Sequence, residues 1–459
     1  MWSRFLLVFY SVVCSLCLPA GRDRPIFTIY EIPEWIRYEG YVAERHHVTT
    51  HDGYILEMHR IPYGQHQTTS ATRRPVVFMM HGLMVASNSY IALGSQRGVA
   101  YNFADAGFDV WLGNARGNTL SRRHVTLDPD DSEDKSQFFD FSFEEIGMYD
   151  VAQMIDYVLN YTGNEKLHYI GHSQGGTAFL VLASMKPEYN EKFTSVHLLA
   201  GVGYQEYFPN SALRTLATFT NVIYAAALGL GIVEVDSPLS FNRTTDDSAD
   251  YSLPDICDDN AEQEFLCDLE TITKLIRDDV IEEDIMGSMF GGAALKQIAH
   301  YGQNIRDKSF RRWNYGAIRN REIYGSTSPP IYNISLITAN VTMHYTVNDN
   351  LLDERDVLAM ANDMPNTVVR RVARDDFLHA DFVAAFDAKD LVTDYIIESM
   401  LQLQDIEYIE SEEDDSENID DSTESEDITD PNKPDSSSII VLSLMIKIYL
   451  SIYALWVIV

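Results

Sequence analysis

The chain has 459 residues and a formal net charge of −35, from 34 Lys and Arg against 69 Asp and Glu. Because phosphate backbones are bound by Lys and Arg, this charge argues against nucleic acid as a partner. A hydrophobic fraction of 46% excludes a chain that is disordered throughout, and four cysteines are too few for a disulfide-dense scaffold.

The N-terminus has the pattern of a cleaved secretory signal. In residues 1–20, Arg4 precedes an apolar run over residues 5–18, and small residues follow. An oxidising compartment on that route would favour a disulfide between the two remaining cysteines, Cys257 and Cys267. Four N-x-Ser/Thr acceptor sequences for glycosylation fit the same route; they begin at Asn160, Asn242, Asn333 and Asn340.

Strands and helices alternate in the first half of the remaining chain. Apolar runs typical of buried parallel strands occupy residues 76–80, 109–112 and 167–170. A capping box at Ser142 begins a helix whose apolar positions between 151 and 159 form one stripe, and residues 175–185 form a second helix. This alternation predicts an α/β fold with a mostly parallel sheet flanked by helices.

The alternation is interrupted between residues 204 and 330. This stretch has helical patterns without clear strands, and its apolar run 222–235 is too short to span a bilayer, so a buried or interfacial helix is expected there. Strand signals return after Pro330; they occupy residues 334–337, 341–347 and 367–372. We therefore expect a mainly helical cap (204–330) inserted between two parts of one core, residues 21–203 and 331–403.

The C-terminal residues have a different composition. Between residues 405 and 435 there are fifteen Asp or Glu and one Lys, so residues 404–438 are expected to form an extended acidic linker. Residues 439–459 are almost wholly apolar and long enough to cross a bilayer, although Lys447 lies near their middle. This tail predicts membrane attachment, either as a transmembrane segment or as a lipid-anchor signal.

Ser173 is the candidate nucleophile. It lies in Gly171-His172-Ser173-Gln174-Gly175, where a predicted strand meets the following helix. A sharp corner of this kind lifts a side chain out of the sheet, and glycines are needed because a Cβ would collide there. The alternative is a tight glycine turn that exposes an inert serine.

A serine hydroxyl needs a base to take its proton, and the base needs an orienting carboxylate. In this architecture the chain order is serine, acid, histidine, and Asp349 and His379 both follow predicted strands. Position alone leaves the acid open, because five other carboxylates lie nearby. They are Asp353, Asp356, Asp375, Asp376 and Asp381.

His81-Gly82-Leu83 follows the first strong strand. A small residue there lets a backbone N–H point at a developing oxyanion, with the amide of Gln174 as the second donor. An ordinary glycine turn after a strand has the same pattern. The sequence contains no metal-ligand spacing, phosphate loop or dinucleotide fingerprint, so no metal or other cofactor is expected.

Several motifs in this order resemble the acid lipase family, which includes the gastric and lysosomal acid lipases. They are Val48-Thr49-Thr50-His51-Asp52-Gly53-Tyr54-Ile55-Leu56 with Arg60-Ile61-Pro62, the His81-Gly82-Leu83 turn, residues 109–118 and residues 171–177. The similarity spans residues 33–403. It implies an α/β-hydrolase core with an inserted cap, and hydrolysis of carboxylic esters of lipids.

The resemblance also implies roles for single residues. Ser173 matches the nucleophile, Asp349 the acid and His379 the base. The backbone N–H groups of Leu83 and Gln174 match the oxyanion donors, and Cys257 and Cys267 match a cap disulfide. The chain departs from the family at Val347, where a glycine is usual, and at Leu378, where an asparagine is usual.

The resulting hypothesis is a lipase that cleaves triacylglycerols or sterol esters at a lipid–water interface through an acyl-enzyme. The expected location is the secretory pathway, extracellular or tethered to the cell surface, with the lysosome as an alternative. Two rival functions remain: an esterase or thioesterase that uses the same triad on smaller substrates, and a non-catalytic lipid-binding protein with a hydrolase fold.

Overall fold

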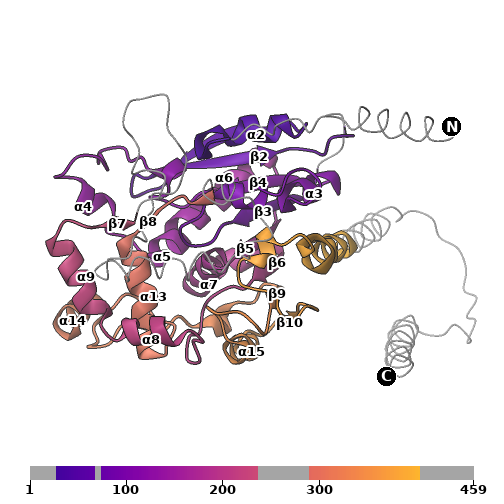
Figure 1. Cartoon of the computed structure of the whole chain (residues 1–459). Coiled ribbons are helices and arrows are strands. Elements are labelled where there is room, and N and C mark those ends of the chain that lie inside the picture. Colours follow the sequence, from indigo (N-terminus) through magenta and orange to yellow (C-terminus); the bar gives the residue numbers. More distant parts are fainter. Residues whose placement is uncertain (1–26, 68–73, 236–288, 404–459) are drawn as a thin grey trace, which may run out of the picture. The chain divides into compact units, whose positions relative to one another are not determined.

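A computed structural model describes residues 27–67, 74–235 and 289–403 of the chain (Figure 1). Several predicted features lie outside these ranges: the signal (1–20), Asn242, the cysteines Cys257 and Cys267, the acidic linker (404–438) and the apolar tail (439–459). Within the described ranges, no helix is long and apolar enough to span a bilayer.

An eight-stranded sheet runs through the described residues. Its strands are β1 (Glu44–Thr49), β2 (Ile55–Ile61), β3 (Val76–Met80), β4 (Asp109–Gly113), β5 (Leu167–His172), β6 (Phe193–Leu199), β9 (Val341–Tyr345) and β10 (Thr367–Arg371). Their spatial order is β1-β2-β4-β3-β5-β6-β9-β10. β2 pairs antiparallel with β1 and β4, and every other neighbouring pair is parallel, which confirms the predicted α/β fold.

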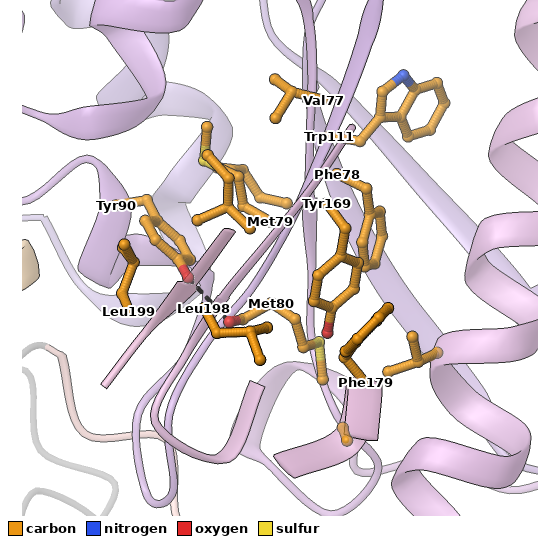
Figure 2. Packing of buried hydrophobic residues seen from close by; sticks show 14 of the residues in the cluster. Val77, Phe78, Met79, Met80, Tyr90, Trp111, Tyr169, Phe179, Leu198 and Leu199 are labelled. Atoms are coloured by element: carbon orange, nitrogen blue, oxygen red, sulfur yellow. Dashed lines mark hydrogen bonds between the residues drawn. The ribbon is translucent and has the colours of Figure 1, made fainter. Parts of the chain in front are cut away.

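The central strands form the core. Every residue of β3, β4 and β5 is buried, so both faces of the sheet are covered and the strands are mostly apolar, without a polar face. Figure 2 shows the packing around Phe78 and Tyr169, whose ring centroids lie 5.9 Å apart. At the carboxyl end of β3, the Tyr90 hydroxyl donates to the carbonyl of Met80 at 2.8 Å, which fixes the strand where it leaves the sheet.

Five helices of the core pack on this sheet. They are α2 (Ile32–Tyr38), α3 (Val99–Asp105), α6 (Ala152–Thr162), α7 (Gln174–Met185) and α15 (Glu354–Asp363). The core also has three shorter helices, α4 (Lys135–Phe138), α5 (Phe143–Glu145) and α16 (Asp381–Ala384). The predicted capping box is confirmed: the Ser142 hydroxyl accepts from the N–H of Glu144 at 3.2 Å, and Glu145 accepts from the N–H of Ser142 at 2.7 Å. The predicted apolar stripe between residues 151 and 159 is buried.

Between β6 and β9 the chain forms α8 (Ser211–Ala217), α9 (Thr220–Gly229), β7 (Glu234–Val235), β8 (Ala293–Ala294), α13 (Leu295–Asp307) and α14 (Ala317–Tyr324). α13 packs against α8 and α9, as seen in Figure 1. Residues 222–235 were expected to form one helix, but the helix in this run is shorter. α9 ends at Gly229, and Gly231 turns the chain with a φ of +76°. The run is also not buried: Val222 is 70% exposed and Leu230 is 78% exposed.

One predicted strand is wrong. Residues 334–337 were expected to be extended, but Ile334–Leu336 form the 3-10 helix η7. The cause is local: the Asn333 side chain accepts from the N–H and the hydroxyl of Ser335, at 3.3 and 2.7 Å, and such a turn competes with strand pairing. The other two predicted strands are confirmed, as β9 and β10.

Candidate active site

Ser173 occupies the sharp turn between β5 and α7. Its backbone is left-handed, with φ +50° and ψ −113°, and its N–H donates to the carbonyl of Leu199 at 2.9 Å. The glycines make this turn sterically feasible: a Cβ on Gly175 would lie 2.0 Å from the carbonyl oxygen of Met80. The turn therefore presents a partly exposed serine hydroxyl at the carboxyl end of the central strand.

His379 and Asp349 meet although they are 30 residues apart in the chain. Asp349 follows β9 and His379 follows β10, and His379 Nδ1 lies 2.7 Å from Asp349 Oδ2. The other oxygen of Asp349 accepts from the N–H groups of Leu351 and Leu352, at 2.8 and 3.0 Å. Both side chains are buried, 7% and 2% exposed, so the carboxylate orients the imidazole and leaves Nε2 as its basic nitrogen.

The five competing carboxylates have other partners. Asp353 caps α15 and pairs with Arg355, and Asp356 accepts from two backbone N–H groups of residues 206 and 207. The remaining three form ion pairs with arginines. Asp375 pairs with Arg371, and both Asp376 and Asp381 pair with Arg374. Asp349, by contrast, lies directly against the ring of His379.

His172 joins the serine turn to the histidine loop. Its Nε2–H donates to the backbone carbonyl of His379 at 2.9 Å. Burial lowers the pKa of His172 to about 3, so the ring remains a neutral donor. The residue next to Ser173 thus holds the backbone of His379 in place. The sequence gives no sign of this contact, which joins residues separated by 207 positions.

The predicted oxyanion donors border the same turn. A Cβ on Gly82 would lie 3.3 Å from Ser173 Cβ, so the loop that continues into Leu83 packs directly on the serine. The N–H of Leu83 has no backbone acceptor among the described residues. Gln174 is the first residue of α7, where a backbone N–H lacks an intrahelical partner. Its side chain accepts from Gln297 Nε2 at 3.1 Å, so α13 lies beside the site.

The remaining predicted sites are surface positions. Asn160, Asn333 and Asn340 are all exposed, as acceptors for a bulky glycan must be. Among residues 27–67, 74–235 and 289–403, no group of three or more His, Cys, Asp or Glu side chains could hold a metal ion.

Known proteins resemble this chain over most of its length. Residues 32–94 match the partial α/β-hydrolase lipase region, and residues 75–253 match the α/β-hydrolase fold. Lipase 3 of Drosophila melanogaster is 36% identical over 85% of this chain and 96% of its own, and Lipase 1 of the same species is 38% identical over 77% and 75%. Gastric triacylglycerol lipase of Rattus norvegicus is 31% identical over 81% and 91%.

These matches and the sheet order define the class of the protein as an α/β-hydrolase. Within that class, the sequence identity to the lipases and the share of each chain that is aligned are high enough to assign a family. The chain belongs to the acid lipase family, and it is an enzyme of the lipase type.

Proposed function

We propose that the protein hydrolyses carboxylic esters of lipids, triacylglycerols or sterol esters, with Ser173, His379 and Asp349 as a catalytic triad. The observation that carries the proposal is the 2.7 Å contact between His379 Nδ1 and Asp349, on loops that the sheet brings to the serine turn. Each residue follows a different strand in the parallel part of one sheet, and such sheets hold their sites at the carboxyl ends of the strands.

The reaction follows from the orientation of the imidazole. His379 Nε2 takes the proton of the Ser173 hydroxyl as the oxygen attacks the ester carbonyl, and it then protonates the leaving alcohol. Asp349 stabilises the imidazolium and holds the ring. A water molecule, deprotonated by the same nitrogen, then attacks the acyl-serine and releases the fatty acid.

The negative charge that develops on the carbonyl oxygen needs donors that are already in place. The N–H groups of Leu83 and Gln174 fit this role, because both border Ser173 and neither is used within a helix or strand. Removing one such donor typically lowers kcat by about 10²–10³-fold.

We also propose that α9 and the turn after it meet the lipid surface. This region exposes six large apolar side chains on consecutive turns, although soluble proteins rarely expose contiguous apolar patches of this kind without a function. The six are Phe219, Val222, Ile223, Leu228, Leu230 and Ile232. α9 packs against α13, which contacts the site through Gln297, so a lipid surface on α9 would lie close to the triad.

The double variant Val222→Ser/Leu230→Ser tests this interface. It should lose most activity on an emulsified long-chain glyceride and keep its activity on a soluble short-chain ester, because neither side chain belongs to the triad. Val125→Ser is a matched control, since Val125 is 59% exposed and lies outside the α9 region. An equal loss on both substrates would count against the interfacial role.

The catalytic proposal is tested with the purified full chain and its Ser173→Ala variant, assayed on soluble and emulsified esters from pH 4 to pH 8. Hydrolysis that the variant abolishes would support serine catalysis. Preference for emulsified long chains would support a lipase, and preference for short soluble chains would favour an esterase. A folded wild-type protein without turnover would favour a non-catalytic lipid carrier.

We further propose that the protein enters the secretory pathway and is attached to membranes through residues 439–459. The exposure of Asn160, Asn333 and Asn340 supports glycosylation on that route. Removal of N-glycans should shift the mass of the expressed protein. Loss of residues 439–459 should move it from the membrane fraction to the medium, and an unchanged distribution would contradict the attachment.

A further inference from the structure

The segment Asn114–Asn118 supports the loop that follows β3. All five of its residues are buried. The guanidinium of Arg116, only 1% exposed, pairs with Asp52 at 2.6 Å and with Asp150 at 2.7 Å. A buried segment pinned by two paired charges is a rigid platform, and its backbone and side-chain donors keep fixed positions.

This segment determines which nitrogen of His81 carries a proton. Asn118 Oδ1 accepts from the N–H groups of Leu120 and Ser121, both at 3.0 Å, so the amide nitrogen must face the other way. That nitrogen donates to His81 Nε2 at 3.2 Å, and the N–H of Ala115 donates to the same atom at 3.1 Å. Nε2 is therefore an acceptor, and the proton of the neutral ring is on Nδ1.

His81 in turn fixes the peptide that joins Gly82 to Leu83. Its Nδ1 lies 2.7 Å from the carbonyl oxygen of Gly82 and donates to it. The C=O and N–H of a trans peptide point in opposite directions, so holding the Gly82 oxygen directs the N–H of Leu83 to the other side. Burial lowers the pKa of His81 to about 4, and the ring keeps this single donor at neutral pH.

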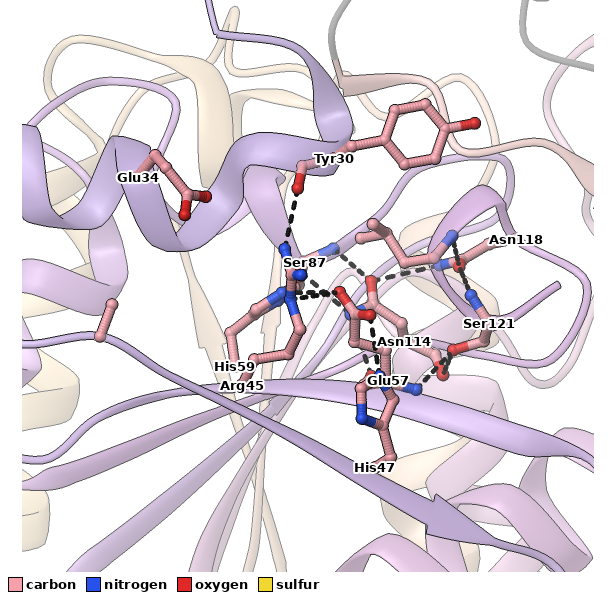
Figure 3. A network of polar contacts seen from close by, with 12 residues as sticks. Tyr30, Glu34, Arg45, His47, Glu57, His59, Ser87, Asn114, Asn118 and Ser121 are labelled. Atoms are coloured by element: carbon pink, nitrogen blue, oxygen red, sulfur yellow. Dashed lines mark hydrogen bonds and ion pairs between the residues drawn. The ribbon is translucent and has the colours of Figure 1, made fainter. Parts of the chain in front are cut away.

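The far end of the loop is tied to the same platform. Asn114 Oδ1 accepts from the N–H of Ser87 at 2.9 Å and from the side chain of Asn118 at 3.2 Å, as Figure 3 shows. The loop between these two ties includes Met84, whose φ of +63° is uncommon for a residue with a side chain. Residues 81–87 are thus anchored at both ends by residues 114–118.

We propose that His81, with its proton placed by Asn118 and Ala115, is a positioning residue that holds the N–H of Leu83 toward the oxyanion. The inference rests on the proposed function, because an oxyanion forms only if Ser173 attacks an ester. If the peptide rotated, the carbonyl oxygen of Gly82 would face the developing negative charge and repel it. The platform prevents that rotation by keeping a donor against the Gly82 oxygen.

Substitution of His81 tests the inference on a soluble ester such as p-nitrophenyl butyrate, with the full chain. His81→Leu removes all three hydrogen bonds of the ring, and kcat should fall by about 10²-fold with an unchanged KM, as for loss of one oxyanion donor. His81→Asn keeps a donor at the δ position and should lose at most about 10-fold. Affinity for a trifluoromethyl ketone analogue, which forms an oxyanion on Ser173, should fall in parallel with kcat.

Two further variants separate positioning from folding. His168→Asn is the matched control: His168 is also buried, with a pKa lowered to about 4, but lies at the opposite end of β5 from Ser173. It should lose stability without losing kcat. Asn118→Asp keeps the oxygen that caps Leu120 and Ser121 but removes the amide NH₂ that donates to His81 Nε2 and to Asn114 Oδ1. Both supports of residues 81–87 are then weakened, so kcat should fall although the cap is intact.

The outcomes are distinct. The inference is overturned if His81→Leu keeps kcat within about 3-fold of the wild type, or if kcat falls only as far as in His168→Asn at equal loss of stability. A wild-type protein without esterase activity, or an active Ser173→Ala variant, would instead overturn the proposed function itself. The inference is supported when His81→Leu and Asn118→Asp lose kcat and His81→Asn largely retains it.

Discussion

Replacing Asp349 by Asn should invert the proton arrangement of His379 while the shape of the site is kept. Asp349 Oδ1 accepts from the N–H groups of Leu351 and Leu352, at 2.8 and 3.0 Å. An Asn side chain would keep its oxygen at this position, which places its NH₂ group against His379 Nδ1, now 2.7 Å from Oδ2. The ring would accept at Nδ1 and carry its proton on Nε2, where it cannot take the proton of Ser173.

A misplaced proton of this kind lowers kcat by about 10⁴-fold in a Ser-His-Asp enzyme, which corresponds to about 5.4 kcal/mol in the activation free energy. We expect that loss on a soluble ester at pH 7, with KM and the melting temperature little changed. Asp353→Asn is the control, because Asn caps a helix as well as Asp does and Asp353 lies at the N-terminus of α15. The reasoning is refuted if Asp349→Asn loses less than about 10-fold, or if Asp353→Asn loses as much.

Other predictions concern the supports of the site and its stability. His172→Phe should lower kcat by at most about 5-fold, because the carbonyl of His379 loses a hydrogen bond of about 1 kcal/mol; steady-state assays and urea unfolding at matched pH would check this. Gly175→Ala should prevent folding or strongly lower the melting temperature, since the added Cβ would lie 2.0 Å from the Met80 oxygen, and normal folding by circular dichroism would contradict the steric argument. The free energy of unfolding should fall as the pH drops from 6.5 to 5, because seven buried histidines have pKa values below the unfolded value of about 6.5, so the unfolded state binds protons that the folded state does not. Three buried carboxyls oppose the trend because burial raises their pKa, to about 6 in Asp150 and also in Asp109 and Asp356, but the seven histidines outnumber them. A flat urea midpoint over this range would contradict the prediction. The seven are His59, His81, His168, His172, His197, His300 and His344.

Three central strands, β3, β4 and β5, were predictable because each carries its own signal, whereas the largely buried strands β2 and β6 were not predicted. β3, β4 and β5 are buried on both faces, and their sequences are accordingly mostly apolar, with Asp109, His168 and His172 as the exceptions. β1 gives no such signal, since Val48 is its only buried residue, and a polar edge strand has no apolar periodicity to detect. Its pairing with β2 is visible only in three dimensions.

The site was predictable in part for the same reason. The serine turn has a local signature, with glycines where the backbone needs them, and the order of the acid and the histidine follows from the topology. The choice of Asp349 among six candidate carboxylates does not follow from the topology. It depends on a 2.7 Å contact between two loops that are 30 residues apart, and no local sequence pattern predicts that contact. His172 and His81 could not be assigned from the sequence, since each acts through a backbone carbonyl that leaves no pattern in side chains.

The left-handed backbone of Ser173 has a consequence for variation in this chain. At a φ of +50° every residue except glycine is disfavoured, by about 1–3 kcal/mol. Ser173→Gly should therefore raise the thermal stability of the protein while it removes the hydroxyl. Glycine at position 173 would favour stability, whereas turnover requires serine. A screen that selects only for heat resistance would therefore enrich Ser173→Gly proteins, which are folded but inactive.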